Sequence, residues 1–169
     1  RITSSPRRNW PCALIGTLEG LPAKDVPSWR LTWEGWRGGV IPNREGRRLV
    51  EAEAIALAPA LAAGVCAGEI FAHFAGDHLM AGHRAAGLSL WNPGSDWLEA
   101  NPTERVLALL PSQLWLIGLG NLGQAYAWLL ACLPYRDRNQ IELLLQDFDR
   151  IASSNESTSL LSFNADVGK

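Results

Sequence analysis

Three glycines in the C-terminal part of the chain have a spacing suited to holding a phosphate. Gly118, Gly120 and Gly123 form G-x-G-x-x-G, directly after the apolar run 114–117 and at the start of the helically spaced run 122–133. Such glycines let the chain turn sharply out of a strand, bring bare backbone against a phosphate, and pack a helix closely on the sheet. The free N–H groups of the first helical turn then face the anion. The pattern predicts a phosphate-binding loop.

An acidic residue follows the next predicted strand. Residues 141–146 form a mostly apolar strand candidate, and Asp147 stands at its carboxyl end. An acidic side chain at that position usually accepts hydrogen bonds from a ribose hydroxyl. Strand, glycine turn, helix, strand and acid together predict a nucleotide site. The same parts also occur without a ligand, the glycines as a plain turn and the aspartate as a cap.

The residues after this second strand narrow the class of nucleotide-binding protein. Asp147-Phe148-Asp149 is followed by Ser154-Asn155. This D-x-D and S-N block resembles the ThiF and E1-like adenylating enzymes, the family that activates ubiquitin-like and sulfur-carrier proteins. The resemblance runs from residue 114 to 155 and continues more weakly to the V-G at 167–168. It covers the last third of the chain and is more specific than the glycines alone.

The resemblance implies a Rossmann-like fold and an ATP site. In that family ATP and Mg²⁺ adenylate the carboxyl terminus of a small ubiquitin-like or sulfur-carrier protein and release pyrophosphate, and the enzymes are commonly homodimers. Chemistry of this kind consists mostly of positioning and charge neutralisation. The cofactor-binding residues implied are the glycine loop with Gly118, Gly120, Asn121 and Gly123, then Asp147 at the ribose, and Asp149 and Asn155 beside the phosphates.

Two residues depart from the family's pattern. Thr158 stands where the family has an Arg three residues after the Asn, and a hydroxyl cannot replace the charge and forked donors of a guanidinium. Lys169 comes too soon after the V-G to match the family's phosphate-binding Lys. The magnesium-binding Asp of the family belongs to a later strand, so we assign no metal ligand and no catalytic residue. ATP binding is expected of this chain, and adenylation only of a longer protein.

Two other functions fit the same residues. The glycine pattern and Asp147 are equally typical of an NAD(P)-binding oxidoreductase, for which the S-N segment has no role. A non-catalytic E1-like interaction module that has kept the fold is consistent with Thr158. Binding of ATP compared with NADH, and pyrophosphate exchange, distinguish the three.

The predicted fold class is α/β, in two regions. Residues 106–169 form the first part of a Rossmann-like domain, with a parallel sheet that is incomplete at its C-terminus. An open parallel sheet needs more strands to cover both faces, so we expect the chain to be a fragment of a longer protein. Residues 1–105 form an accessory α/β region with Trp-rich strands and a long buried helix.

Hydrophobic patterning predicts the elements of the accessory region. Strands are expected at 12–18 and 29–41, the second interrupted by glycines, and a helix from 47 to about 74. Pro59 should kink this helix or mark the boundary between two pieces, and the many Ala and Gly residues of the segment suggest tight packing. The remaining segments are expected as a loop-rich connection at 79–102 and short helical turns at 104–110.

Composition limits the partners. The 169 residues are 47% apolar with a net charge of −2, which is typical of a soluble globular protein. The basic residues of the N-terminal part are scattered among Trp, Pro and Gly instead of forming a helical stripe, so no nucleic-acid partner is predicted. The longest apolar run is too short for a bilayer, and no membrane span or signal peptide is predicted.

Cysteines and histidines give no metal site. Cys12, Cys66 and Cys132 form no C-x-x-C pair. Cys66 and Cys132 lie in apolar runs and are predicted to be buried thiols, which fits a reducing cytoplasm. Three histidines recur every five residues from His73 to His83, a spacing that turns side chains away from one another on a helix.

Overall fold

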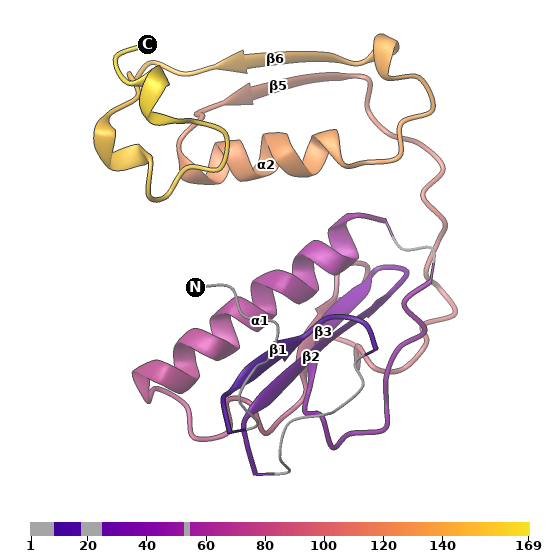
Figure 1. Ribbon diagram of the computed structural model, residues 1–169. Coiled ribbons are helices and arrows are strands. Elements are labelled where there is room, and N and C mark those ends of the chain that lie inside the picture. Colours follow the sequence, from indigo (N-terminus) through magenta and orange to yellow (C-terminus); the bar gives the residue numbers. More distant parts are fainter. Residues whose placement is uncertain (1–8, 18–24, 53–54) are drawn as a thin grey trace. The chain divides into compact units, whose positions relative to one another are not determined.

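The protein is mixed α/β, as predicted. The computed structural model describes residues 9–17, 25–52 and 55–169. The chain forms two compact units, Arg1–Val106 and Leu107–Lys169. Each unit contains one sheet with an α-helix against it (Figure 1).

Unit 1 is built on a four-stranded mixed sheet. The strands lie in the order β1-β2-β3-β4, with β1 parallel to β2 and the other neighbours antiparallel. Their bounds are β1 Cys12–Leu14, β2 Ser28–Glu34, β3 Arg37–Ile41 and β4 Ala86–Ser89.

The predicted strands of this unit are present, with different bounds. β1 is shorter than 12–18, of which residue 18 lies outside the described residues. The predicted strand 29–41 is a hairpin of β2 and β3, which turns at Gly35 with a φ of 55°. β4 lies in the segment 79–102, which was predicted to be a loop-rich connection, and the strand itself was not predicted. Its sequence Ala-Gly-Leu-Ser has little strand propensity, so pairing with β3 defines it.

The helix α1, Leu57–Ala75, packs on this sheet (Figure 1). It begins at Leu57 and not near residue 47, and residues 53–54 of the predicted range lie outside the described residues. Pro59 lies in the first helical turn, where its missing N–H removes no intrahelical hydrogen bond. Pro59 therefore requires no kink, and it marks no boundary between two pieces because α1 is a single helix. Gly76, with a φ of 73°, ends the helix in the left-handed conformation.

Small residues bring α1 close to β3. A Cβ on Gly38 would lie 2.3 Å from the carbonyl oxygen of Ala58 and 3.3 Å from the nitrogen of Ala62. Ala58 and Ala62 are fully buried, so the predicted tight packing is correct for them. Gly64 and Gly68 lie on the exposed side of α1, with open space around both positions.

By length and composition alone, α1 is apolar enough to cross a membrane. The core helix of a soluble protein meets the same criteria. Length and composition therefore do not assign the helix to a membrane or to a protein core. In the structure, one face of α1 packs on β2 and β3.

The core of unit 1 lies on both faces of the sheet. Side chains alternate along a strand, so Val40 and Ile41 belong to different clusters. One cluster faces α1 and the other is formed with residues from the segments after β3 and β4. The first contains Trp29, Leu31, Val40, Ala62 and Cys66, and the second Ile41, Leu49 and Trp97.

Unit 2 has the predicted order of strand, helix and strand. It consists of β5 Gln113–Ile117, α2 Asn121–Ala131 and β6 Glu142–Gln146, with β5 and β6 parallel. These elements confirm the predicted ones within two residues at each end. The helical turns predicted at 104–110 are wrong, because that segment has no regular structure. Short 3₁₀ turns lie at Arg138–Gln140, Ser153–Asn155 and Asn164–Asp166.

One face of the β5–β6 sheet is open within this unit. α2 lies against the other face (Figure 1). Trp115, Ile117 and Leu144 point away from α2 and are 62%, 58% and 57% exposed. No described element of unit 2 covers them. The described part of unit 2 therefore contains two parallel strands with one helix on one face.

The cysteines differ from one another in burial. Cys66 is buried, as predicted. Cys132 is exposed, and that prediction was wrong because the residue follows the last turn of α2 at the surface. None of the three is in a disulfide, and burial raises the pKa of the Cys66 thiol.

Candidate functional site

The three glycines of the loop between β5 and α2 have three different reasons to be glycine. Gly118 has a φ of 88°, a conformation that other residues rarely adopt. A Cβ on Gly123 would lie 1.8 Å from the carbonyl oxygen of Gly118, so only glycine lets α2 approach the loop. Gly120 is extended, with a φ of −63°, and a Cβ there would meet no protein atom within 4 Å. Nothing in the described protein requires glycine at position 120.

The first turn of α2 presents free amide groups. The first N–H groups of any α-helix have no intrahelical acceptor. Gly120 is the N-cap of α2, and no side chain caps the helix or places an acid in its first turn. The described residues supply no acceptor for the amides of residues 120–123. These amides, at the positive end of the helix dipole, form an arrangement that attracts anions.

Asp147 links the two loops that follow β5 and β6. Its carboxylate accepts a hydrogen bond from the N–H of Leu119 at 2.5 Å and another from the N–H of Asp149 at 2.9 Å. The bond from Asp149, followed by that from Leu119, lowers the pKa of Asp147 below its ordinary value. The predicted ribose ligand is therefore also the residue that holds the glycine loop in place.

Gln124, directly after the third glycine, fastens a second segment to the loop. Its buried side chain donates to the carbonyl oxygen of Leu119 at 2.9 Å and to the hydroxyl of Ser162 at 3.4 Å. Its own oxygen accepts from the N–H of Leu161 at 2.7 Å. One amide thus connects the glycine loop with residues near the C-terminal end.

Asn121 contributes to the same attachment. Its side-chain oxygen accepts from the hydroxyls of Thr158 and Ser159, each at 3.1 Å. Thr158, at the family's Arg position, thus contacts the start of α2. The sequence predicted that Asn121 contacts the cofactor. In the structure its side chain instead contacts Thr158 and Ser159.

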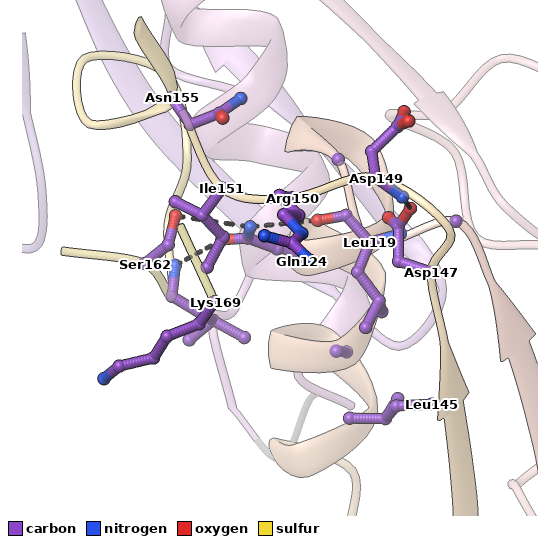
Figure 2. A pocket seen from close by; sticks show the side chains of 14 residues that line it. Leu119, Gln124, Leu145, Asp147, Asp149, Arg150, Ile151, Asn155, Ser162 and Lys169 are labelled. Atoms are coloured by element: carbon purple, nitrogen blue, oxygen red, sulfur yellow. Dashed lines mark hydrogen bonds between the residues drawn. The ribbon is translucent and has the colours of Figure 1, made fainter. Parts of the chain in front are cut away.

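These parts surround a pocket of about 560 Å³ in unit 2 (Figure 2). That volume lies within the range of small-molecule and cofactor sites. Of the predicted site residues, five line the pocket and two, Asn121 and Gly123, do not. The five are Gly118, Gly120, Asp147, Asp149 and Asn155.

Sequence reasoning missed four polar residues of the pocket lining. They are Gln124, Arg150, Ser162 and Lys169. Gln124 and Arg150 stand directly after the third glycine and after the D-F-D block, and their proximity to these motifs was the available signal. Lys169 was noted only as misplaced relative to the family pattern, yet it lines the pocket, with its amine 2.6 Å from Asp166.

The described residues contain no group of three or more His, Cys, Asp or Glu side chains able to hold a metal ion. Two of the three histidines make other contacts. The ring of His73 packs edge-on against Trp29, with centroids 5.5 Å apart, and His78 contacts the guanidinium of Arg84. The carboxylates available to a cation in the pocket are those of Asp147 and Asp149.

The fold and the pocket define an α/β protein with a glycine-loop pocket at the carboxyl ends of two parallel strands. The chain belongs to the BilD family. The family model of the BilD N-terminal domain matches residues 1–90, and that of the BilD C-terminal domain matches residues 110–169.

A curated relative gives the family its context. The bacterial E1-like protein BilD of Collimonas sp. (strain OK412) is 61% identical over 163 residues, which make up 96% of this chain and 35% of that protein. The chain thus spans 35% of the length of this relative. The E1-like part of the resemblance seen in the sequence is confirmed.

Proposed function

We propose that unit 2 is the ATP-binding part of an E1-like adenylating enzyme. The longer protein would activate the C-terminal carboxylate of a ubiquitin-like or sulfur-carrier protein. The proposal combines the E1-like relative with the glycine-loop pocket, and it interprets β5, α2 and β6 as the start of a Rossmann-like domain.

Gly120 is the observation that carries this proposal. Gly118 needs its positive φ and Gly123 its close packing, but the described protein leaves open space where a side chain at 120 would lie. Gly120 also lines the pocket. A phosphate that approaches the bare backbone there explains the missing side chain.

The remaining residues fit the parts of a nucleotide. The free amides at the start of α2 suit the phosphates. Asp147 stands at the carboxyl end of β6, where a carboxylate can accept from ribose hydroxyls with the lone pairs that its two backbone bonds leave free. Asp149 and Asn155 line the same pocket, consistent with positions beside the phosphates. Mg²⁺, expected with ATP, would reduce the charge of the phosphates at these carboxylates.

The proposed reaction joins a carboxylate to the α-phosphorus of ATP. A carboxylate oxygen of the carrier forms the new bond, the bond to the bridging oxygen breaks, and pyrophosphate leaves with the electron pair. The attacked phosphorus carries negative oxygens, so this step depends on donors and cations fixed around it. The α2 amides and the cations of the pocket are the groups of this chain that can serve in that way.

A glycine substitution tests the proposal in the full-length protein. Gly120→Ala should leave the fold intact and weaken ATP binding about 10- to 100-fold, since an added methyl in a filled site costs about 1–3 kcal/mol. Gly64→Ala is the matched control, because its added methyl also meets open space, on α1 of unit 1. Calorimetry with ATP and with NADH measures both affinities. Equal ATP binding by Gly120→Ala, or binding of NADH without ATP, would count against the proposal.

A second candidate function is binding without adenylation. It is favoured by Thr158, which stands at the family's Arg position. Its hydroxyl donates a hydrogen bond to the side chain of Asn121, and the residue does not line the pocket. ATP–pyrophosphate exchange in the presence of the carrier separates the two. Exchange supports the enzyme, whereas ATP binding without exchange supports the interaction module.

A further inference from the structure

The charges of the pocket are balanced between two acids and two bases. Asp147 and Asp149 supply carboxylates, and Arg150 and Lys169 supply cations. A polyphosphate that enters beside two carboxylates is repelled unless a cation faces it. A cationic side chain without a partner in the protein can turn to such a ligand at the lowest cost.

Only one of the two cations is already paired within the described residues. The Lys169 amine lies 2.6 Å from the carboxylate of Asp166, and this contact is the main reason that the pKa of Asp166 is lowered. For the guanidinium of Arg150 the described residues supply neither a hydrogen bond nor an ion pair. Figure 2 shows both side chains among those that line the pocket.

The backbone on both sides of Arg150 is fixed although its side chain is free. On one side, the N–H of Asp149 donates to Asp147 at 2.9 Å. On the other side, Ile151 accepts from the N–H of Gly168 at 2.8 Å and donates to the carbonyl oxygen of Lys169 at 3.2 Å. A side chain on an anchored backbone loses less entropy when it binds than one on a loose loop.

We propose that Arg150 binds and orients the nucleotide phosphates, together with the amides of the glycine loop. The role rests on the proposed function of this pocket. A guanidinium always carries its charge and offers two parallel N–H donors to a phosphate. Arg150 thereby supplies in this pocket the forked cation that Thr158 cannot supply.

The test compares nucleotides with and without phosphates in the full-length protein. Arg150→Gln should lower the affinity for ATP about 10- to 100-fold, the usual range for a charge-assisted hydrogen bond, and change the affinity for adenosine less than about twofold. Arg150→Lys should retain part of the ATP affinity. Arg138→Gln is the matched control, since Arg138 lines a different cavity and its loss removes the same charge.

The affinities for ATP and adenosine distinguish the role of Arg150 from the presence of an ATP site. An Arg150→Gln variant that binds ATP like the wild type, or that loses ATP and adenosine affinity equally, would overturn the role of Arg150 and leave the ATP site standing. A wild-type protein that binds ATP no better than adenosine would overturn both. An unchanged melting temperature for Arg150→Gln shows that the variant is folded, as an exposed side chain without partners predicts.

Discussion

The two units bury their sheets very differently. In unit 1 both faces are covered, and Trp29, Val40 and Ile41 are at most 1% exposed. In unit 2 α2 covers one face, while Trp115 and Ile117 on the other are more than half exposed. The sheet of unit 1 is buried on both faces, whereas the sheet of unit 2 has an apolar face that no described element of that unit covers.

The two units also differ in the contacts that their residues make. Unit 1 uses close backbone contacts, such as that of Gly38 with Ala58, to pack its interior. Unit 2 shapes a pocket with side-chain hydrogen bonds, in which the Asp147 carboxylate accepts from the N–H of Leu119 and the Gln124 amide donates to the carbonyl oxygen of Leu119. Substitutions in the core of unit 1 should therefore change the free energy of unfolding more than substitutions of pocket residues in unit 2.

The largest effect is expected from tryptophan truncation. Trp29→Ala should destabilise unit 1 by about 3–5 kcal/mol, because it empties a buried site. Trp115→Ala should cost unit 2 less than about 1 kcal/mol, because its ring is largely exposed. Hydrogen exchange of β2 and of β5 amides measures each unit separately. A large cost for Trp115→Ala would show that another part of the full-length protein covers this face.

Gly123→Ala should destabilise unit 2 by about 3 kcal/mol, since its Cβ would overlap the carbonyl oxygen of Gly118. Gly120→Ala, three residues earlier, should change the stability by less than about 1 kcal/mol. Thermal unfolding of both variants gives the comparison. Similar melting temperatures for the two would contradict the different roles assigned to these glycines.

A smaller cost is expected at Gln124. Gln124→Ala leaves the carbonyl oxygen of Leu119 and the N–H of Leu161, both in part-buried hydrogen bonds, without their partner and should cost about 1–2 kcal/mol. In this variant, hydrogen exchange of the Leu161 amide should accelerate more than hydrogen exchange of the β6 amides. Gln113→Ala is the control, because that glutamine is exposed and its loss should cost less than about 0.5 kcal/mol.

The smallest effect on stability is expected when the carboxylate of Asp147 is protonated at low pH. The pKa of Asp147 is lowered in the folded protein, so its ionised form stabilises the loop above the unfolded pKa, and this contribution disappears as the pH falls through the folded pKa. Carboxyl NMR titration should give a midpoint below the ordinary value of 3.8. The Leu119 amide signal should move over the same pH range, and in Asp147→Asn it should not.

Much of unit 2 could be predicted because its signals are local. A strand, a glycine turn and a helix follow one another directly, and Asp147, which lines the pocket, comes directly after β6. The contacts of Asn121 with Thr158 and of Gln124 with Leu161 could not be assigned from sequence, because each joins residues 37 positions apart and the second segment has no regular patterning.

Unit 1 was predicted less well, because contacts distant in sequence decide its bounds. The helical pattern from residue 47 fails at Glu51, which has a φ of 59° and donates its N–H to the carbonyl oxygen of Trp33. β4 exists through its pairing with β3 and not through its own residues. In both cases tertiary contacts override local propensity.

The link from Asp147 to Leu119 has a kinetic consequence. Glycine-rich segments lose the most freedom when they become ordered, but this segment is already held before any ligand arrives. Association then requires no folding step, so its rate constant is set by diffusion and charge. If the pocket binds nucleotide as proposed, ligands of different affinity should therefore differ mainly in residence time, and the aspartate would preorganise the site for them.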